Sequence, residues 1–439
     1  MKVGKAILAG ILAATAANAP AQTGPAPAAA APAHKFDPAE VIGEVRKLIA
    51  EKYVLPERRP ALDEVLAEGL GSGRYAVRDP ALFAERVNAD LARVGRDHHL
   101  NFKYAPQKVA MMMAPEPGGR PGPPPGFEAQ VRRDNHGVRQ LRVLPGNVRY
   151  LELAGFDWIG DESAAVLDSA MAFLKGGDAV VIDLRRNGGG AARAVHQLIS
   201  HFVAADTPLI TVYRGGEASR MLKSLPGLST MVGKPLYVLT SGATGSAAEE
   251  FVGHVAGYKL GEVVGAKTSG AGFMNGMYAF EEGFELSVSE ARTVLASTGK
   301  DWERVGIAPT VAAPVETALE VAHVHALRKL AATDSARRAE LQAMAAGLEA
   351  ARRPGKPAAE LAAYAGSYGD RRIFVEGGKL WYRQEERPAQ AMIPLGGHVF
   401  TFAEAPLLRL TFQPAGERLA AFDLGPAMGP VQGRYERTP

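Results

Sequence analysis

The chain has 439 residues, enough for two or three domains with a sizeable buried core. Its 50 Lys and Arg residues nearly balance its 47 Asp and Glu residues, and the net charge of +3 excludes the broad basic field that holds nucleic acid. There is no cysteine, and the ten histidines include no His-Glu-x-x-His pair, so we expect no disulfide, no cysteine nucleophile, and no metal or other cofactor.

The N-terminal residues predict export. Two lysines precede the apolar run Ala6–Ala17, which is too short to anchor the chain in a bilayer. Small residues follow, so we predict a signal peptide over residues 1–21, cleaved after Ala21, and a periplasmic or otherwise exported protein; a retained N-terminal anchor is the alternative. Residues 22–35 form an Ala/Pro-rich linker, and no later stretch is apolar enough to span a membrane.

Helices are predicted after the linker. Asp37-Pro38 and Asp79-Pro80 each place a capping side chain before a proline, which is typical of the first turn of a helix. Apolar residues follow both pairs at helical spacing, so residues 36–105 are interpreted as an N-terminal helical domain. Residues 106–140 include a stretch dense in proline and glycine, and are expected to form a loop.

Strands and helices alternate in the central part of the chain. The apolar runs Val148–Leu153, Ala179–Leu184 and Leu236–Thr240 predict buried strands, and the amphipathic segments between them predict helices. Such alternation favours a largely parallel sheet with crossover helices. Residues 141–316 are therefore predicted to form an α/β core.

The C-terminal part differs from this core in its pattern. Residues 317–358 are helical in pattern and increasingly charged, and are interpreted as a helical connector. Residues 359–439 show short alternating runs separated by glycine turns, which predict a small C-terminal β domain with antiparallel strands. This domain is the only support for one minor hypothesis, a scaffolding protein of the envelope.

Two loops that follow buried strands are candidate sites, because that edge of an α/β sheet usually carries the functional residues. In Asp183–Gly190, three glycines allow backbone N–H groups to face an oxyanion, although a simple tight turn has the same composition. In Thr240–Glu249, Ser246 opens a predicted helix whose dipole favours a nearby oxyanion. Ser246 is therefore a candidate nucleophile, and a helix-capping serine is the alternative.

Four motifs occur in order along the chain: Asp183-Leu-Arg-Arg-Asn-Gly-Gly-Gly190, Ser246-Ala-Ala-Glu249, Val263-Val-Gly-Ala-Lys-Thr-Ser-Gly270 and Val305-Gly-Ile-Ala-Pro309. Together they resemble the tail-specific, or C-terminal-processing, serine protease family. The resemblance extends from about Phe36 to Pro314, roughly two thirds of the chain. It implies a serine-type peptidase with a crotonase-like spiral α/β core.

The general base is not the lysine that one branch of this family uses. The resemblance puts that lysine near Ala271, and Lys267 lies four residues too early. The run Asp97-His98-His99-Leu100 instead resembles a motif of the branch that contains tricorn protease and the interphotoreceptor retinoid-binding protein. That resemblance implies His99 as the general base and Glu303 as the carboxylate that supports it.

A serine, a histidine and a carboxylate form a chemically complete set. The serine hydroxyl is a weak nucleophile that needs a base tuned near neutral pH, and the carboxylate fixes the imidazole tautomer. His98 is the alternative base. The oxyanion would accept hydrogen bonds from the N–H of Ala247 and from that of Gly189 or Gly190.

The resulting hypothesis is an exported serine peptidase that hydrolyses peptide bonds through an acyl-enzyme, with a peptide or protein as its substrate. The competing hypothesis is a non-catalytic protein that binds hydrophobic ligands on the same fold, which the missing lysine and the retinoid-binding relative suggest. The two differ in a simple way, because a serine-directed reagent should react only with the peptidase.

Overall fold

The computed structural model describes residues 3–6, 36–113, 126–214, 217–416 and 418–438. The chain forms two compact units, an N-terminal unit (1–141, 151–175 and 182–315) and a C-terminal unit (142–150, 176–181 and 316–439). The predicted signal peptide and linker lie outside the described residues, apart from Val3–Ala6.

Three helices open the N-terminal unit: α1 (Pro38–Lys52), α2 (Arg59–Gly71) and α3 (Pro80–Gly95), with a 3-10 turn η1 at Pro56–Arg58. Asp37 accepts a hydrogen bond of 2.8 Å from the N–H of Ala39. Asp79 likewise accepts from the N–H groups of Ala81 and Leu82. Both predicted N-caps are confirmed, and the proline after each fits there because the first helical N–H has no partner to lose.

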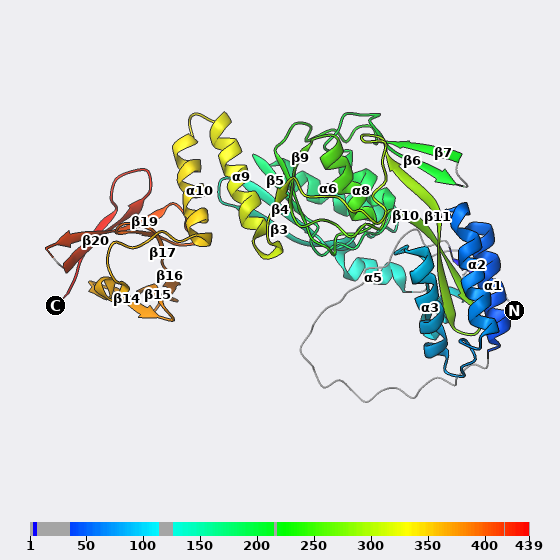
Figure 1. Ribbon diagram of the computed structural model, residues 1–439. Helices are drawn as coiled ribbons and strands as arrows, with labels where there is room; N and C mark the ends of the chain where they lie inside the picture. Colours follow the sequence, from blue (N-terminus) through cyan, green and yellow to red (C-terminus); the bar gives the residue numbers. More distant parts are fainter. Residues whose placement is uncertain (1–2, 7–35, 114–125, 215–216, 417, 439) are drawn as a thin grey trace. The chain divides into compact units, whose positions relative to one another are not determined.

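The three helices pack on an antiparallel sheet with the strand order β1-β10-β11-β6-β7, in which β2 also pairs with β11. Its strands are β1 (Val3–Ala6), β2 (Asn101–Tyr104), β6 (Pro208–Arg214), β7 (Glu217–Lys223), β10 (Phe273–Phe280) and β11 (Phe284–Leu295). Buried residues of the helices, such as Ile42 and Phe83, share one core with Phe280 and Leu286 of the sheet. Figure 1 shows the helices beside β10 and β11. Helices and sheet therefore form one body, which places the residues after α3 against β11.

The second sheet has the strand order β12-β9-β8-β5-β4-β3. Its strands are β3 (Val138–Leu144), β4 (Val148–Leu153), β5 (Ala179–Asp183), β8 (Leu236–Thr240), β9 (Gly261–Gly265) and β12 (Val311–Ala312), and the intervening helices are α6 (Asp161–Lys175), α7 (Ala192–Ile199) and α8 (Ala247–Gly257). β9 pairs parallel with both β8 and β12. The predicted alternation is confirmed, but a largely parallel arrangement is wrong for the other sheet, because the short turn between β10 and β11 can join only antiparallel strands.

The expectation of a loop over residues 106–140 is wrong for the described part of that segment. It contains α4 (Pro106–Met113), α5 (Phe127–Arg133), the 3-10 turn η2 (Asn135–Gly137) and the start of β3. Good helix formers such as Gln, Lys, Met, Glu and Arg dominate both helices. The stretch that is dense in proline and glycine, 114–125, lies outside the described residues.

The C-terminal unit begins with two helices in place of one predicted helical stretch. The 3-10 turn η3 (Val315–Thr317) leads into α9 (Ala318–Thr333). A break that begins at Asp334 separates α9 from α10 (Arg338–Arg352). The side chain of Asp334 accepts hydrogen bonds from the N–H groups of Ala336 and Arg337, a local alternative to the helical ladder.

The rest of the C-terminal unit is a small β structure, as predicted. A turn of helix, α11 (Leu361–Tyr364), precedes two antiparallel sheets. They comprise β13 (Gly366–Tyr368), β14 (Arg371–Glu376), β15 (Lys379–Gln384) and β16 (Gln390–Ala391), and then β17 (Ile393–Gly396), β18 (Val399–Thr401), β19 (Leu408–Ala415), β20 (Arg418–Pro426) and β21 (Gly433–Glu436). Aromatic residues, among them Tyr364, Phe400, Phe412 and Phe422, fill a core of this unit's own.

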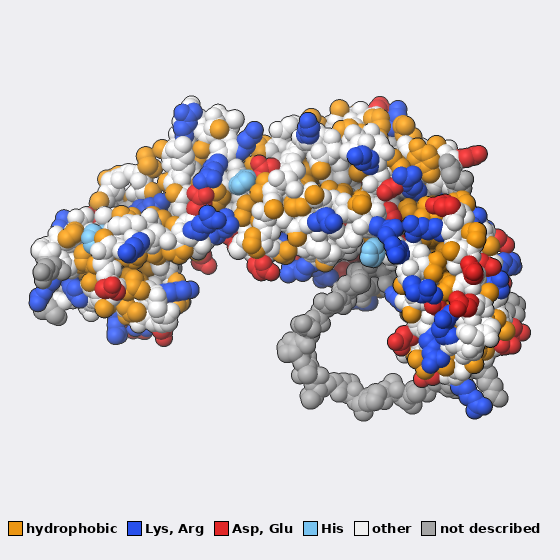
Figure 2. All heavy atoms as spheres, in the orientation of Figure 1, with side chains coloured by type: hydrophobic (Ala, Val, Ile, Leu, Met, Phe, Trp, Pro, Cys, Tyr) orange, Lys and Arg blue, Asp and Glu red, His pale blue; other side chains and the backbone are white. Residues whose placement is uncertain are grey.

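Surface charge is mixed where it can be seen. Figure 2 shows basic and acidic side chains interspersed over the helices α1–α3, so this face offers no basic patch of the kind that binds nucleic acid. In the part of the chain that the structure describes, no helix combines the length and the apolar character needed to cross a bilayer.

Candidate active site

Ser246 lies at the N-cap position of α8, after the loop that follows β8. Its backbone angles are φ 51° and ψ −119°. A serine that only caps a helix adopts the ordinary extended region, whereas a non-glycine residue in a sparsely populated region costs about 1–3 kcal/mol and is found mainly at functional sites. The cap position is therefore real, but capping by itself does not require this conformation.

Glu249 holds Ser246 in this conformation. Its buried carboxylate accepts a hydrogen bond of 2.9 Å from the N–H of Ser246. It also accepts from the N–H groups of Gly270 and Ala271, at 2.7 and 2.8 Å. The Thr268 hydroxyl donates to it as well, at 2.6 Å. Glu249 belongs to a motif found in the sequence, but the sequence did not predict its role. That role depends on its burial on the first turn of α8, opposite a separate loop, which only the fold shows.

Two backbone N–H groups beside Ser246 are available to an oxyanion. The N–H of Gly189 is taken, because it donates to the side chain of Asn187 at 2.9 Å. Within the described residues, the N–H groups of Gly190 and Ala247 donate to no acceptor, and both residues line the pocket at Ser246. Of the two predicted glycines, Gly190 thus has the free donor.

Gly189 has a different role in this loop. Its φ is 116°, in a region that favours glycine. A Cβ added to it would lie 2.7 Å from the Cβ of Ser246 and 3.1 Å from the nitrogen of Ala247. The absence of a side chain at Gly189 is what allows the two loops to approach each other.

A small cavity of about 60 Å³ opens at Ser246. It is lined by Gly190, Ala192, Ser246, Ala247, Glu250, Ala271, Gly272, Phe273, Met274, Asn275, Thr293 and Trp302. Ala271, where the resemblance puts the lysine of the Ser-Lys branch, is part of this lining, whereas Lys267 is exposed and is not. The position that the resemblance assigns to a lysine base is therefore at the cavity, but the residue there is the alanine Ala271.

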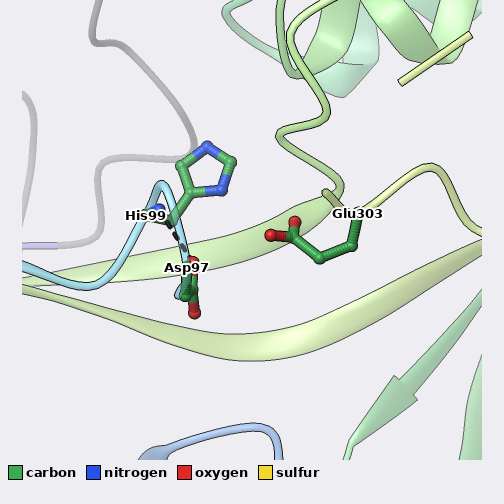
Figure 3. A group of neighbouring side chains, drawn as sticks. All are labelled: Asp97, His99 and Glu303. Atoms are coloured by element: carbon green, nitrogen blue, oxygen red, sulfur yellow. Dashed lines mark hydrogen bonds between the residues drawn. The ribbon is translucent and has the colours of Figure 1, made fainter. Parts of the chain in front are cut away.

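His99 belongs to a second group of side chains, with Asp97 and Glu303 (Figure 3). One nitrogen or oxygen atom of each residue lies within 4.8 Å of those of the other two. Asp97 turns the chain after α3 by accepting the N–H of His99 at 2.8 Å and that of Leu100 at 3.3 Å. His98 is exposed, so of the two predicted candidates His99 is the one in this group.

Burial sets the proton affinities in this group. Burial and then the nearby charge of Asp97 raise the pKa of Glu303 to about 8. Burial lowers the pKa of His99, which the charge of Asp97 opposes. The structure therefore favours a neutral imidazole, the form that a general base needs.

Ser246 and His99 are linked through one short segment but are not hydrogen-bonded to each other. Glu303 accepts hydrogen bonds from the N–H groups of Gly272 (2.6 Å) and Phe273 (3.2 Å), and both of these residues line the cavity at Ser246. Within the described residues, no hydrogen bond joins the imidazole of His99 to Ser246.

A further acidic residue of the cavity, Glu250, was not singled out from the sequence. It is buried and lies 3.0 Å from Nε2 of His196 and 3.6 Å from Nε2 of His254. Burial opposes ionisation, but the two histidines outweigh it and lower the pKa of Glu250 to about 2. The spacing of Glu250 and His254, four residues apart on one helix, is the signal that could have found this pair.

Two family profiles match the chain. One is described as peptidase family S41 and matches residues 147–313, and the other is described as the N-terminal domain of peptidase S41 in eukaryotic IRBP and matches residues 33–134. The two matches together extend from residue 33 to residue 313, nearly the same part of the chain as the resemblance inferred from the motifs.

Curated relatives are similar over part of the chain. A chloroplastic C-terminal processing peptidase of Tetradesmus obliquus is 29% identical over 163 residues, 37% of this chain and 34% of the relative. A probable CtpA-like serine protease of Staphylococcus epidermidis is 24% identical over 187 residues, 42% of this chain and 37% of the relative. The chain thus matches about a third of the length of these relatives.

Solved structures with a similar chain path include the photosystem II D1 C-terminal processing protease, with a TM-score of 0.45 and 17% identity over 64% of this chain and 94% of that one. Mature CPAF gives a TM-score of 0.44 and 12% identity, over 67% of this chain and 97% of that one. Tricorn protease gives a TM-score of 0.42 and 13% identity, over 71% of this chain and 37% of that one.

Proposed function

Because the chain belongs to peptidase family S41, we propose that it is an exported serine peptidase that cleaves peptide bonds through an acyl-enzyme on Ser246. The observation that carries the proposal is the strained backbone of Ser246 beside two free N–H groups, those of Ala247 and Gly190. A nucleophile next to two unpaired donors is the arrangement that acyl transfer requires, since negative charge develops on the carbonyl oxygen as the bond forms.

In this mechanism His99 takes the proton of the Ser246 hydroxyl and later gives it to the leaving amine. Figure 3 shows one ring nitrogen of His99 facing the Glu303 carboxylate, which leaves the other nitrogen for the serine. Glu303 would hold the ring and stabilise the imidazolium, whose positive charge in turn favours the ionised carboxylate. The hydrogen bond between His99 and Ser246 would form on substrate binding, since such bonds are often long before the substrate arrives.

The substrate is a peptide or protein, and the core of the N-terminal unit is proposed to be crotonase-like. Export through a signal peptide over residues 1–21 belongs to the same proposal. Cleavage after Ala21 would remove strand β1, which pairs with β10. Mass determination of the N-terminus of the protein from the periplasm tests this part, and an N-terminus at Met1 would contradict it.

The absence of a hydrogen bond between His99 and Ser246 is what favours the alternative, a non-catalytic protein that binds hydrophobic ligands. The match of residues 33–134 to the N-terminal domain found in eukaryotic IRBP points the same way.

A fluorophosphonate probe, which labels only activated serines, separates the two hypotheses. We expect labelling of the natural protein and none of the Ser246→Ala variant, with the two proteins unfolding at the same temperature. Labelling that persists in Ser246→Ala would assign the nucleophile elsewhere, and a natural protein that binds apolar probes without ever being labelled would support the binding protein.

A further inference from the structure

The side chains of Asp97, His99 and Glu303 each keep one buried polar atom without a hydrogen bond in the described residues. These atoms are Oδ2 of Asp97, Nδ1 of His99 and Oε1 of Glu303. Asp97 and Glu303 are only 8% and 9% exposed. Buried polar atoms are almost always paired. The buried Tyr53 hydroxyl interacts with the Asp97 carboxylate and can satisfy its free oxygen, so the free atoms of His99 and Glu303 are the ones that require an explanation.

The group also has no basic partner in the part of the chain that the structure describes. Neither Asp97 nor Glu303 forms an ion pair with lysine or arginine among the described residues. A Ser-His-carboxylate set uses one acidic side chain beside the imidazole, and here there are two. Two buried carboxyl groups side by side repel each other when both are ionised, and either a proton on one of them or a cation between them removes this repulsion.

The free atoms are presented as the ligands of a metal ion would be. The other oxygen of each carboxylate is tied to the backbone, that of Asp97 to the N–H of His99 and that of Glu303 to the N–H of Gly272. Such second hydrogen bonds orient the ligands in metal sites. Ligand atoms about 2.0–2.2 Å from a tetrahedral zinc ion lie about 3.3–3.6 Å apart. Atoms within 4.8 Å of one another would therefore have to close in by up to about 1.5 Å, which rotation of the side chains can supply.

We propose that Asp97, His99 and Glu303 bind one divalent transition-metal ion, and that the ion inhibits the peptidase. A metal ion on Nδ1 of His99 leaves the ring proton on Nε2, so that Nε2 cannot accept the proton of the Ser246 hydroxyl. One imidazole and two carboxylates suit Zn²⁺ and its neighbours better than Ca²⁺ or Mg²⁺, which take oxygen ligands alone. Three protein ligands leave the remaining positions to water. Binding requires no catalysis, whereas the inhibition rests on the proposed function.

The binding is tested by calorimetric titration of Zn²⁺ into the Ser246→Ala protein, which keeps the three ligands and cannot form an acyl-enzyme. We expect one ion per chain. On this background Asp97→Asn and Glu303→Gln, which keep the oxygen that accepts the backbone N–H, should each weaken binding at least tenfold. His98→Gln, an exposed histidine next to the group, should leave it unchanged.

Co²⁺ provides a second readout, because its visible absorption reports coordination directly. The Co²⁺ spectrum should appear in the Ser246→Ala protein and in its His98→Gln variant, and it should be lost in both carboxylate variants. If one of the carboxylate variants is too unstable for calorimetry, this spectrum decides whether the residue binds the metal. No binding, binding undiminished in Asp97→Asn and Glu303→Gln, or binding that depends on His98 would each overturn the proposal.

Inhibition is tested on the natural protein by fluorophosphonate labelling. Zn²⁺ at the concentration that saturates the site should block labelling, and EDTA should restore it. Binding in the Ser246→Ala protein without loss of labelling in the natural protein would overturn the inhibitory role. If the natural protein is never labelled, the peptidase hypothesis fails, and the calorimetric result still decides the metal site.

Discussion

Glu249 and Glu303 divide four consecutive backbone N–H groups between them. Those of Gly270 and Ala271 bind Glu249, and the next two along the chain bind Glu303. The carboxylate that holds Ser246 and the carboxylate that faces His99 are therefore positioned by the single segment 270–273, which leads into β10. A movement of this segment would shift both carboxylates together.

We predict that Glu249→Gln lowers both the free energy of unfolding and the rate at which a fluorophosphonate probe labels the protein. The amide has one acceptor oxygen and directs its NH₂ group at N–H donors, so at least one buried donor loses its partner, at a cost of about 1–3 kcal/mol. Chemical denaturation and the rate of fluorophosphonate labelling measure the two effects. Glu64→Gln, an exposed glutamate on α2, is the control and should change neither. If Glu249→Gln and Glu64→Gln had the same stability and the same labelling rate, Glu249 would have no role at the site.

Gly189→Ala should abolish labelling, since the added Cβ would lie 2.7 Å from that of Ser246. It should also destabilise the protein by about 1–3 kcal/mol through backbone strain and steric overlap. Gly233→Ala separates these causes, because Gly233 has a φ of 78° and open space around its Cβ position. That variant should lose stability through strain alone, by about 1 kcal/mol, and keep its labelling. Full labelling of Gly189→Ala would contradict the close approach of the two loops.

The choice between the two histidines leads to a third prediction. His99→Ala should slow labelling by about 100- to 10,000-fold, the usual contribution of a general base. His98→Ala is the matched control, and because its side chain is exposed the rate should stay within about twofold of the natural protein. The reverse order of the two rates would make His98 the base.

Stability should fall in acid through Glu250, whose pKa lies at about 2 in the folded protein against 4.5 for an ordinary glutamate. A carboxylate with a lowered pKa stabilises the fold above pH 4.5, and that stability is lost as the pH falls from about 4.5 to about 2. The loss is about 3 kcal/mol at most.

Denaturation at pH 6 and at pH 3 measures this effect. Glu250→Gln should be less stable than the natural protein at pH 6 and should change less between the two pH values. A variant that loses as much stability as the natural protein on acidification would show that the pairs with His196 and His254 contribute nothing.

Local signals in the sequence were enough to predict many elements of the fold. The two Asp-Pro pairs define the starts of α1 and α3, because a cap acts within one turn of the chain. The bounds of β4 and β8 follow from short apolar runs. The break at Asp334 and the helices within 106–140 were missed, because side-chain competition and average helix propensity are weaker signals than proline or glycine.

The candidate site, too, could be predicted from the sequence only in part. Its residue types and their order along the chain, from His99 through Ser246 to Glu303, could be read from motifs, since these are properties of short segments. Only the tertiary structure decides that Gly190 has the free N–H, that Asp97 joins His99 and Glu303, and that Glu249 anchors the nucleophile. Each of these depends on a hydrogen bond or a close contact between different segments of the chain. Such contacts form only when the helices, the strands β10 and β11 and the loops pack together in the folded protein.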